Sequence, residues 1–335
     1  MNHENNQIES IDSTAENLKK GLFPFPFIIE IHPTDVCNQR CDYCFHEGIG
    51  FGNSPKKEQL FTLAEYKALF REMKELGIKN LSIAGGGEPF LDVRMPQILY
   101  SSRGENLGVR IVTNGNIISN EAMKEVMYCE EIRFSVDTIK PETYFALRHV
   151  SANELLNTLS NIQRTVELKK SSDSTLSVGA TFLVNSKNYV EAEEFSRYML
   201  NLGVDAVIIK YNIYGIFGIS EEDLQKTENT LHKINDPRIE LRDRTPINPA
   251  GLKCYIPFFK VAMNSYGDLY SCCLGSQPRE QSGYLLGNLH GTSFKDVWKG
   301  AETTVQQMLI SGVGCKNCNY TDHKINRRLI SLLSN

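Results

Sequence analysis

The stretch Cys37-Asn38-Gln39-Arg40-Cys41-Asp42-Tyr43-Cys44 decides how the rest of this chain is interpreted. Its three cysteines are spaced C-x3-C-x2-C and follow an apolar run, Phe27–Ile31. Three thiolates on one short loop can converge on a single soft metal centre. A structural zinc ion would need a fourth ligand from His32, His46 or a distant residue. A [4Fe–4S] cluster held by three cysteines instead leaves one iron open to bind a substrate. Three structural thiols are the remaining alternative.

Three further motifs lie in or just after later apolar runs. They are Gly85-Gly86-Gly87-Glu88-Pro89, Thr113-Asn114-Gly115 and Ser135-Val136-Asp137. With the cysteine triplet ahead of them, these motifs make the chain resemble the radical S-adenosylmethionine (SAM) superfamily from about Phe27 to Asn212. A second resemblance covers Cys254 to Cys318.

Composition limits the possible partners. The chain has 335 residues, with 36 Lys+Arg against 40 Asp+Glu, so its formal net charge is −4. No stretch is strongly basic, which argues against nucleic acid as the main substrate. The N-terminus lacks the apolar core of a signal peptide, and no apolar run approaches the length of a membrane span. We therefore expect a cytoplasmic protein with no membrane partner.

The chain contains nine cysteines, an odd number. In a chain without a secretory signal, clustered cysteines indicate metal ligands rather than disulfides. They divide into a set of three, a set of four and two left over: Cys37, Cys41 and Cys44; Cys254, Cys272, Cys315 and Cys318; and Cys129 and Cys273.

Apolar runs alternate with helix-forming segments from Phe27 onward, which predicts parallel strands in βα units. The expected strands are 27–31, 81–84, 109–113, 132–136, 176–183 and 206–211, and the expected helices are 63–76, 95–101, 120–127, 154–170 and 189–202. Thr62 is expected to cap the first helix, and Gly77 and Gly203 mark helix ends. Six such units suit an α/β fold, a partial (β/α)6 barrel, whose chemistry lies at the C-terminal ends of the strands.

The domain organisation follows from these elements. We expect a lead-in with a short helix at 1–26, the partial barrel at 27–212, a connector at 213–250, a small α+β module at 251–320 and a C-terminal helix at 321–335. Within the module, 258–263 and 269–272 are expected to form a hairpin with a turn at 264–267. A helix around 293–309, containing Trp298, should follow.

The resemblance implies how the first cysteine set works. In radical SAM enzymes the amino and carboxylate groups of SAM chelate the open iron of a [4Fe–4S] cluster, here held by Cys37, Cys41 and Cys44. One electron, from a flavodoxin or ferredoxin, then cleaves SAM to methionine and a 5′-deoxyadenosyl radical that abstracts hydrogen. The cofactor supplies this chemistry, and the protein binds and orients it.

The resemblance also implies roles in binding SAM. Gly86, Gly87 and Glu88 would bind the methionine amino group, and Tyr43 would lie beside the adenine. A neutral turn and a core aromatic position are the respective alternatives.

Three other polar residues are candidates for the same site. Asn114 and Ser135 are plausible contacts to the methionine carboxylate or the ribose, although a turn or capping role is the alternative. Arg148 would pair with a carboxylate of SAM or substrate, unless it is a solvated surface arginine.

The second cysteine set resembles the twitch module, the shortened form of the SPASM domain. Its members, Cys254, Cys272, Cys315 and Cys318, suffice for one auxiliary [4Fe–4S] cluster. The full form uses further cysteines after the final C-x2-C pair, and none follows here, which argues against a second auxiliary cluster. A four-cysteine zinc ribbon is the alternative, since its ligand set is identical.

Two cysteines remain. Cys273 adjoins Cys272 and is either a thiol that donates a hydrogen atom to a substrate radical, as in epimerases of this broad family, or a small buried residue. Cys129 ends an expected helix and is expected to be structural.

The sequence therefore predicts a radical SAM oxidoreductase that binds its substrate between two clusters. The expected reaction is oxidation (dehydrogenation) or a related C–H modification of a small molecule such as a sugar, aminocyclitol or nucleoside. The alternatives are an epimerase or peptide-modifying enzyme that uses Cys273 as hydrogen donor, and a non-catalytic zinc-binding adaptor.

Overall fold

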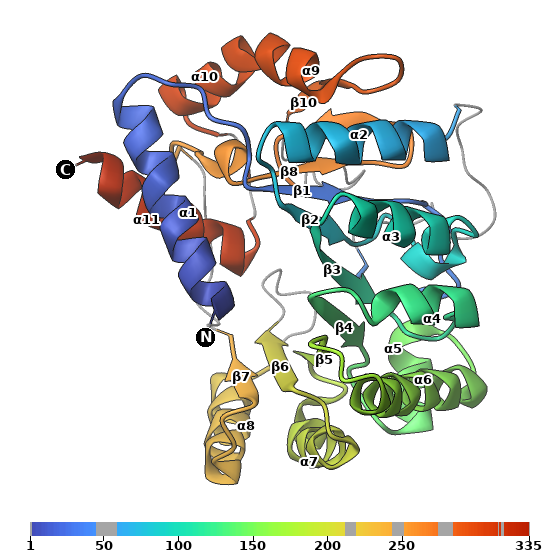
Figure 1. The fold of residues 1–335 in the computed structure, drawn as a ribbon. Helices are drawn as coiled ribbons and strands as arrows, with labels where there is room; N and C mark the ends of the chain where they lie inside the picture. The colour runs from blue at the N-terminus through green and yellow to red at the C-terminus, as the bar shows by residue number, and fades with distance from the viewer. Residues whose placement is uncertain are drawn as a thin grey trace.

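One curved sheet of ten strands organises the described part of the chain (Figure 1). The computed structural model describes residues 2–44, 59–211, 219–242, 251–273, 284–313, 315 and 318–334. The strands lie in the order β10-β9-β8-β1-β2-β3-β4-β5-β6-β7. They are β1 Ile28–Ile31, β2 Asn80–Ile83, β3 Gly108–Thr113, β4 Glu131–Ser135, β5 Ser177–Val184, β6 Ala206–Tyr211, β7 Ile239–Leu241, β8 Lys260–Met263, β9 Asp268–Tyr270 and β10 Leu285–Asn288. The pairs from β8 through β1 to β7 are parallel, whereas β9 and β10 pair antiparallel.

Helices connect the parallel strands, and α2 to α7 lie on one side of the sheet (Figure 1). Their bounds are α2 Leu63–Glu75, α3 Met95–Gly104, α4 Asn120–Val126, α5 Pro141–Arg148, α6 Ala152–Ser171, α7 Ala192–Leu202 and α8 Glu221–Ile234. The predicted cap of α2 is confirmed, because Thr62 and Glu65 form a reciprocal capping box. Gly77 and Gly203 take positive φ of 76° and 90° at helix ends, as predicted.

The predicted α/β fold is confirmed, and each of the six expected strands is present within one residue at either end. The sequence analysis did not predict the elements α5, α8, β7 and β10. The eight-residue helix α5 begins at Pro141, and the short strand β7 contributes only three residues to the sheet edge. The helix expected at 189–202 is divided into a 3-10 turn, Tyr189–Glu191, and α7.

The two faces of the parallel strands differ in polarity, because successive side chains of a strand point to opposite faces. Leu81, Ile111 and Ile132 belong to the main apolar core, which lies between the sheet and the helices. Glu30 and Arg133 occupy alternating positions on the other face, which we call the lumen of the partial barrel. The lumen is therefore lined by polar and charged side chains.

The C-terminal strands extend the barrel sheet directly, because β8 pairs in parallel with β1 and places Lys260 opposite Ile28. The predicted hairpin is confirmed as β8 and β9, although β9 ends at Tyr270, two residues earlier than expected. The helix expected around 293–309 is two helices, α9 Phe294–Gly300 and α10 Glu302–Ile310.

The two terminal helices lie side by side (Figure 1). The first, α1 Asn2–Lys19, is longer than the short helix that was expected, and the predicted C-terminal helix is present as α11 Tyr320–Ser334. Arg328 of α11 pairs with Asp12 of α1 at 2.9 Å. The expected boundaries near residues 212 and 250 lie outside the described residues and stay predictions. No helix in the described ranges is long and apolar enough to cross a membrane.

Candidate active site

The three cysteines of the first set lie on the loop that follows β1 and come close to one another. Each is partly buried. Burial raises the pKa of Cys37 to about 12, and the neighbouring charges of Cys41 and Cys44 contribute to that rise. Burial likewise raises the pKa of Cys41 to about 11. Such thiols keep their protons unless a metal replaces them. The candidate fourth zinc ligand His46 lies outside the described residues.

The backbone of this loop is held by the end of α5. The N–H group of Arg40 donates to the carbonyl of Arg148, and the N–H group of Asp42 donates to the carbonyl of Leu147, both at 3.0 Å. The loop is therefore fixed relative to the carboxyl end of β4, which α5 follows.

The glycine turn after β2 packs directly on the backbone of the same loop. The N–H of Gly87 donates to the carbonyl of Thr34, and the N–H of Glu88 donates to that of Val36, both at 2.8 Å. A Cβ at Gly87 would lie 2.0 Å from the carbonyl oxygen of Val36, and one at Gly86 would lie 2.4 Å from Oδ1 of Asp35. Glycine is therefore required at 87 by close backbone approach, whereas a side chain at 86 would displace the carboxylate of Asp35.

This packing makes a testable prediction. Gly87→Ala should displace the cysteine loop, because the added methyl group meets backbone atoms that cannot rotate away. We expect anaerobically reconstituted Gly87→Ala to lose about four irons, one cubane, measured by iron and sulfide analysis. Gly104→Ala is the matched control, since a Cβ there meets nothing within 4 Å. Full iron content in Gly87→Ala would contradict this role of the turn.

Glu88 joins the glycine turn to the turn after β3. It is only 3% exposed. Its Oε1 accepts from Thr113 Oγ1 at 2.5 Å and from the N–H of Phe90 at 3.2 Å, and its Oε2 accepts from the N–H of Asn114 at 2.7 Å. Burial raises the pKa of Glu88 to about 7, although these hydrogen bonds oppose the rise. The carboxylate therefore positions both motifs.

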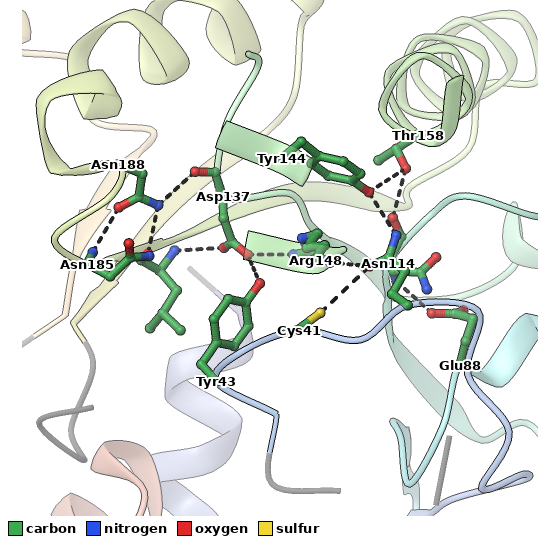
Figure 2. Close-up of polar contacts among 12 residues, drawn as sticks. Cys41, Tyr43, Glu88, Asn114, Asp137, Tyr144, Arg148, Thr158, Asn185 and Asn188 are labelled. Carbon is green, nitrogen blue, oxygen red and sulfur yellow. Dashed lines mark hydrogen bonds and ion pairs between the residues drawn. The ribbon is translucent and has the colours of Figure 1, made fainter. Parts of the chain in front are cut away.

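Asp137 lies at the centre of a buried polar network beyond β4 (Figure 2). Its Oδ2 accepts from Arg148 Nη2 at 2.5 Å and from the hydroxyl of Tyr43. Its Oδ1 accepts from the N–H of Leu183 at 2.8 Å, and Nδ2 of Asn188 donates to its carbonyl at 2.8 Å. Asp137 has a φ of 69°, a conformation that aspartate tolerates better than most residues. It joins β5 to the cysteine loop.

Arg148 is buried rather than solvated, so the surface alternative is wrong for this residue. Besides Asp137, its Nη1 donates to Oε1 of Gln39 on the cysteine loop at 2.6 Å. Gln39 in turn donates to the hydroxyl of Tyr144 at 2.8 Å. Within the described part of the chain, the Nε of Arg148 has no hydrogen-bond partner. One donor of a buried guanidinium therefore remains available beside the cysteine loop.

The other predicted polar contacts are also near this loop. Nδ2 of Asn114 donates to Oδ1 of Asn38 at 2.8 Å, and the Nδ2 of Asn38 donates to Asn116 at 2.8 Å. Ser135 is the last residue of β4, partly buried and opposite Thr181 of β5.

The four cysteines of the second set come together from three separated segments. Burial raises the pKa of Cys254 well above its ordinary value, and the charges of Cys272, Cys315 and Cys318 add to the rise. Burial also raises the pKa of Cys318, and the charges of Asp322, Cys272 and Cys315 add to the rise. The sequence spacing alone could not show that these segments meet.

Cys273 follows the end of β9, so strand alternation does not fix the direction of its side chain. Its Sγ lies 3.5 Å from Nδ2 of Asn319, 3.7 Å from Nζ of Lys260 and 3.8 Å from Oδ2 of Asp322. Lys260 is the first residue of β8. Cys273 therefore lies beside Lys260, a residue of the lumen, and adjoins Cys272 of the second cysteine set.

A chain of charged groups continues from Cys273 along the lumen. Nζ of Lys260 lies 3.0 Å from Asp322 and 3.8 Å from Glu30, and Glu30 lies 3.0 Å from Nε2 of His32. Burial opposes ionisation of Glu30, but Lys260 and His32 outweigh it and lower its pKa to about 2. The sequence analysis named His32 only as a possible zinc ligand and missed Glu30, Lys260 and Asp322, although a charge inside an apolar strand was a usable signal at Glu30 and Lys260.

Comparison with known proteins identifies both the barrel and the C-terminal module. A model of the radical SAM superfamily matches residues 31–176, and a model of the SPASM family, an iron–sulfur cluster-binding domain, matches residues 254–319. The chain belongs to the radical SAM superfamily. Its C-terminal module is a SPASM-type iron–sulfur domain, as the sequence predicted.

Several relatives share much of this radical SAM chain. The tungsten-containing aldehyde ferredoxin oxidoreductase cofactor-modifying protein of Pyrococcus furiosus is 23% identical over 86% of both chains. A probable GTP 3′,8-cyclase of Methanocaldococcus jannaschii is 25% identical, over 55% of this chain and 58% of that protein.

Solved structures share the fold. Streptococcus suis SuiB bound to its precursor peptide SuiA has a TM-score of 0.65 at 16% identity, over 85% of this chain and 67% of SuiB. The protein anSMEcpe with bound AdoMet has a TM-score of 0.60 at 16% identity, over 92% and 99% of the two chains. At such identities these structures establish the fold alone.

A radical SAM domain followed by a SPASM domain implies [4Fe–4S] clusters and SAM, and the cysteines fit such clusters. Among the residues that the structure describes, no three His, Cys, Asp or Glu side chains are arranged to hold a single metal ion. Four thiolates around zinc would lie about 3.8 Å apart, given Zn–S bonds of about 2.3 Å. Ligands of a cubane stand farther apart, because the cluster fills the space between them.

The structure brings most of the predicted SAM-binding residues to one place. Tyr43, Glu88, Asn114 and Arg148 all contact the cysteine loop or the network that holds it. Their roles toward SAM stay predictions. Asp137, which the sequence analysis did not select from its motif, connects two of them.

Proposed function

We propose that this chain is a radical SAM oxidoreductase that removes hydrogen from a C–H group of a small molecule bound in the lumen. When bound, the cluster and SAM would supply a 5′-deoxyadenosyl radical that abstracts the hydrogen atom. One observation carries the proposal. Glu30 lies on β1, the strand that leads into the cysteine loop, and it pairs in the lumen with Lys260 on the neighbouring strand β8. Lys260 in turn lies beside the second cysteine set. A substrate in the lumen would therefore lie between an abstracting site and an electron-accepting site.

The chain's own residues would bind and orient SAM. We infer that Gly86, Gly87 and Glu88 receive the methionine amino group and that Arg148 pairs with the carboxylate, using its available Nε–H. Tyr43 would support the adenine, with its hydroxyl fixed by Asp137.

Three further groups of residues would contact SAM or hold the two clusters. Asn114 and Ser135 would contact the carboxylate or ribose of SAM. Cys37, Cys41 and Cys44 would hold the SAM cluster. The second cysteine set, Cys254, Cys272, Cys315 and Cys318, would hold one auxiliary cluster.

The partners are part of the same proposal. A flavodoxin or ferredoxin would deliver the electron in the cytoplasm, with neither nucleic acid nor membrane involved. The relatives' names include a GTP 3′,8-cyclase, and the SuiB structure contains a precursor peptide. These names are compatible with a nucleotide or a peptide and do not bear on sugars or aminocyclitols, so the substrate class needs an independent argument.

A second candidate is an epimerase or peptide-modifying enzyme that uses Cys273 as hydrogen donor. The position of its thiol, 3.7 Å from Nζ of Lys260 in the lumen, favours it. The zinc-binding adaptor is disfavoured by the radical SAM and SPASM matches.

Deuterated water separates the two reactions, because a thiol exchanges its proton with solvent. Wild type, Cys273→Ala and the control Cys129→Ala would be incubated with SAM, reductant and a substrate found by screening nucleosides, sugars and aminocyclitols. We expect an oxidised, unlabelled product from all three proteins. Deuterium at one carbon of the wild-type product, with turnover lost only in Cys273→Ala, would instead establish the epimerase.

A further inference from the structure

Three cationic side chains gather on the far side of the lumen from Lys260. Arg133 lies on β4, Lys210 on β6 and Arg242 directly after β7. The N–H of Arg242 donates to the carbonyl of Ile209 at 2.9 Å, and Leu241 pairs with Ile209, so Arg242 continues the register opposite Lys210. We call Arg133, Lys210 and Arg242 the basic wall.

The sequence of β5 makes room for Arg133 to approach β6. A Cβ at Gly179 would lie 3.4 Å from Cγ of Arg133 and 3.5 Å from Cδ1 of Ile208. The stem of Arg133 therefore crosses β5 at Gly179 toward the lumen side of β6. Any side chain longer than alanine at 179 would compete with the arginine for this space.

The carboxylates near the basic wall leave one cation uncompensated. Glu131 pairs with Arg133 at 2.5 Å, and Glu240 pairs with Arg242 at 2.8 Å. Among the described residues, no carboxylate lies within ion-pair distance of Lys210. Burial and the charges of the two arginines lower the pKa of Lys210 to about 8. Like charges at this range repel one another unless an anion lies between them.

Lys210 and Arg242 lie at the same level as the proposed SAM site, whereas Arg133 pairs with Gly179, four residues before Leu183 on β5. Lys210 pairs with Leu183 on β5, and the N–H of Leu183 donates to Asp137, the residue that holds Tyr43 and Arg148. An anion bound by Lys210 would therefore lie at the carboxyl ends of the strands, beside SAM. The carboxylate of Asp137 is already engaged by Arg148.

We propose that the basic wall binds a phosphoryl group of the substrate, so that the substrate is a phosphorylated small molecule. This rests on the proposed function and names the chemical class of its substrate. A phosphate monoester carries nearly two negative charges at neutral pH, and guanidinium groups match its oxygens in a bidentate manner. A carboxylate offers only two acceptor oxygens to the three cationic side chains, whereas a phosphoryl group offers three.

Calorimetric titration of anaerobically reconstituted, SAM-loaded protein with inorganic pyrophosphate tests the proposal. We expect saturable binding by wild type and a loss of affinity of roughly tenfold or more in Lys210→Met, typical of one charge-assisted contact. Lys226→Met is the matched control, because Lys226 is exposed on α8 and pairs with Glu222. It should bind as wild type does. Succinate should bind at least tenfold more weakly than pyrophosphate.

Three results would overturn the proposal: no pyrophosphate binding by wild type, equal binding by Lys210→Met, or succinate binding as tight as that of pyrophosphate. If circular dichroism shows Lys210→Met to be misfolded, Arg242→Gln provides the same comparison, since Arg242 is about a third exposed. Cleavage of SAM by the same wild-type preparation separates the two claims. Cleavage without pyrophosphate binding would overturn only the basic wall, and binding without cleavage would overturn only the proposed function.

Discussion

Replacing Cys37, Cys41 or Cys44 with alanine should abolish 5′-deoxyadenosine formation from SAM and dithionite. Each variant should still retain about four irons, one cubane, in the second cysteine set. The reason is that the two sets draw on separate segments of the chain and are buried in separate surroundings. Chromatographic detection of 5′-deoxyadenosine, together with iron analysis, measures both outcomes.

The control for these variants is Cys129→Ala, which removes a buried thiol that belongs to neither cysteine set. It should cleave SAM as wild type does. If all three loop variants still produced 5′-deoxyadenosine, the assignment of the loop to the SAM cluster would be wrong.

Asp137→Asn should lower the free energy of unfolding by roughly 3–5 kcal/mol, because it leaves the buried Arg148 guanidinium without its carboxylate. Asparagine also tolerates the positive φ at this position, so the change tests charge rather than backbone strain. Anaerobic urea unfolding measures the difference. SAM affinity should fall as well, because Asp137 holds both Tyr43 and Arg148.

Asp12→Asn is the matched control for this variant. Asp12 pairs with Arg328 between the terminal helices, with both side chains more than 40% exposed. Exposed pairs contribute at most about 1 kcal/mol. Equal destabilisation by the two variants would show that the buried network does not hold the site together.

The barrel and the cysteine loop could be predicted because their signals are local. Each parallel strand is an apolar run, and the glycine turn follows β2 directly. The resemblance to the radical SAM superfamily, read on these motifs, indicated Tyr43, Glu88 and Asn114. These residues meet because the carboxyl ends of parallel strands lie at one edge of a sheet.

The buried charge networks could not be predicted, because they depend on contacts between distant segments. Glu30 meets Lys260 only because β8 pairs with β1, and no local pattern specifies that pairing. The burial of Arg148 was not predicted, because the short helix α5 that carries it was not recognised in the sequence. Lys210 and Arg242 become neighbours through β7, a strand too short to predict.

The central claim is that two cluster sites flank one lumen, and the iron content of anaerobically reconstituted protein tests it most directly. Wild type should hold about eight irons with matching sulfide, and Cys315→Ala/Cys318→Ala should hold about four while still cleaving some SAM without substrate oxidation. Stoichiometric zinc without iron in wild type would contradict the claim, as would a wild-type value near twelve irons, which would require a third cluster.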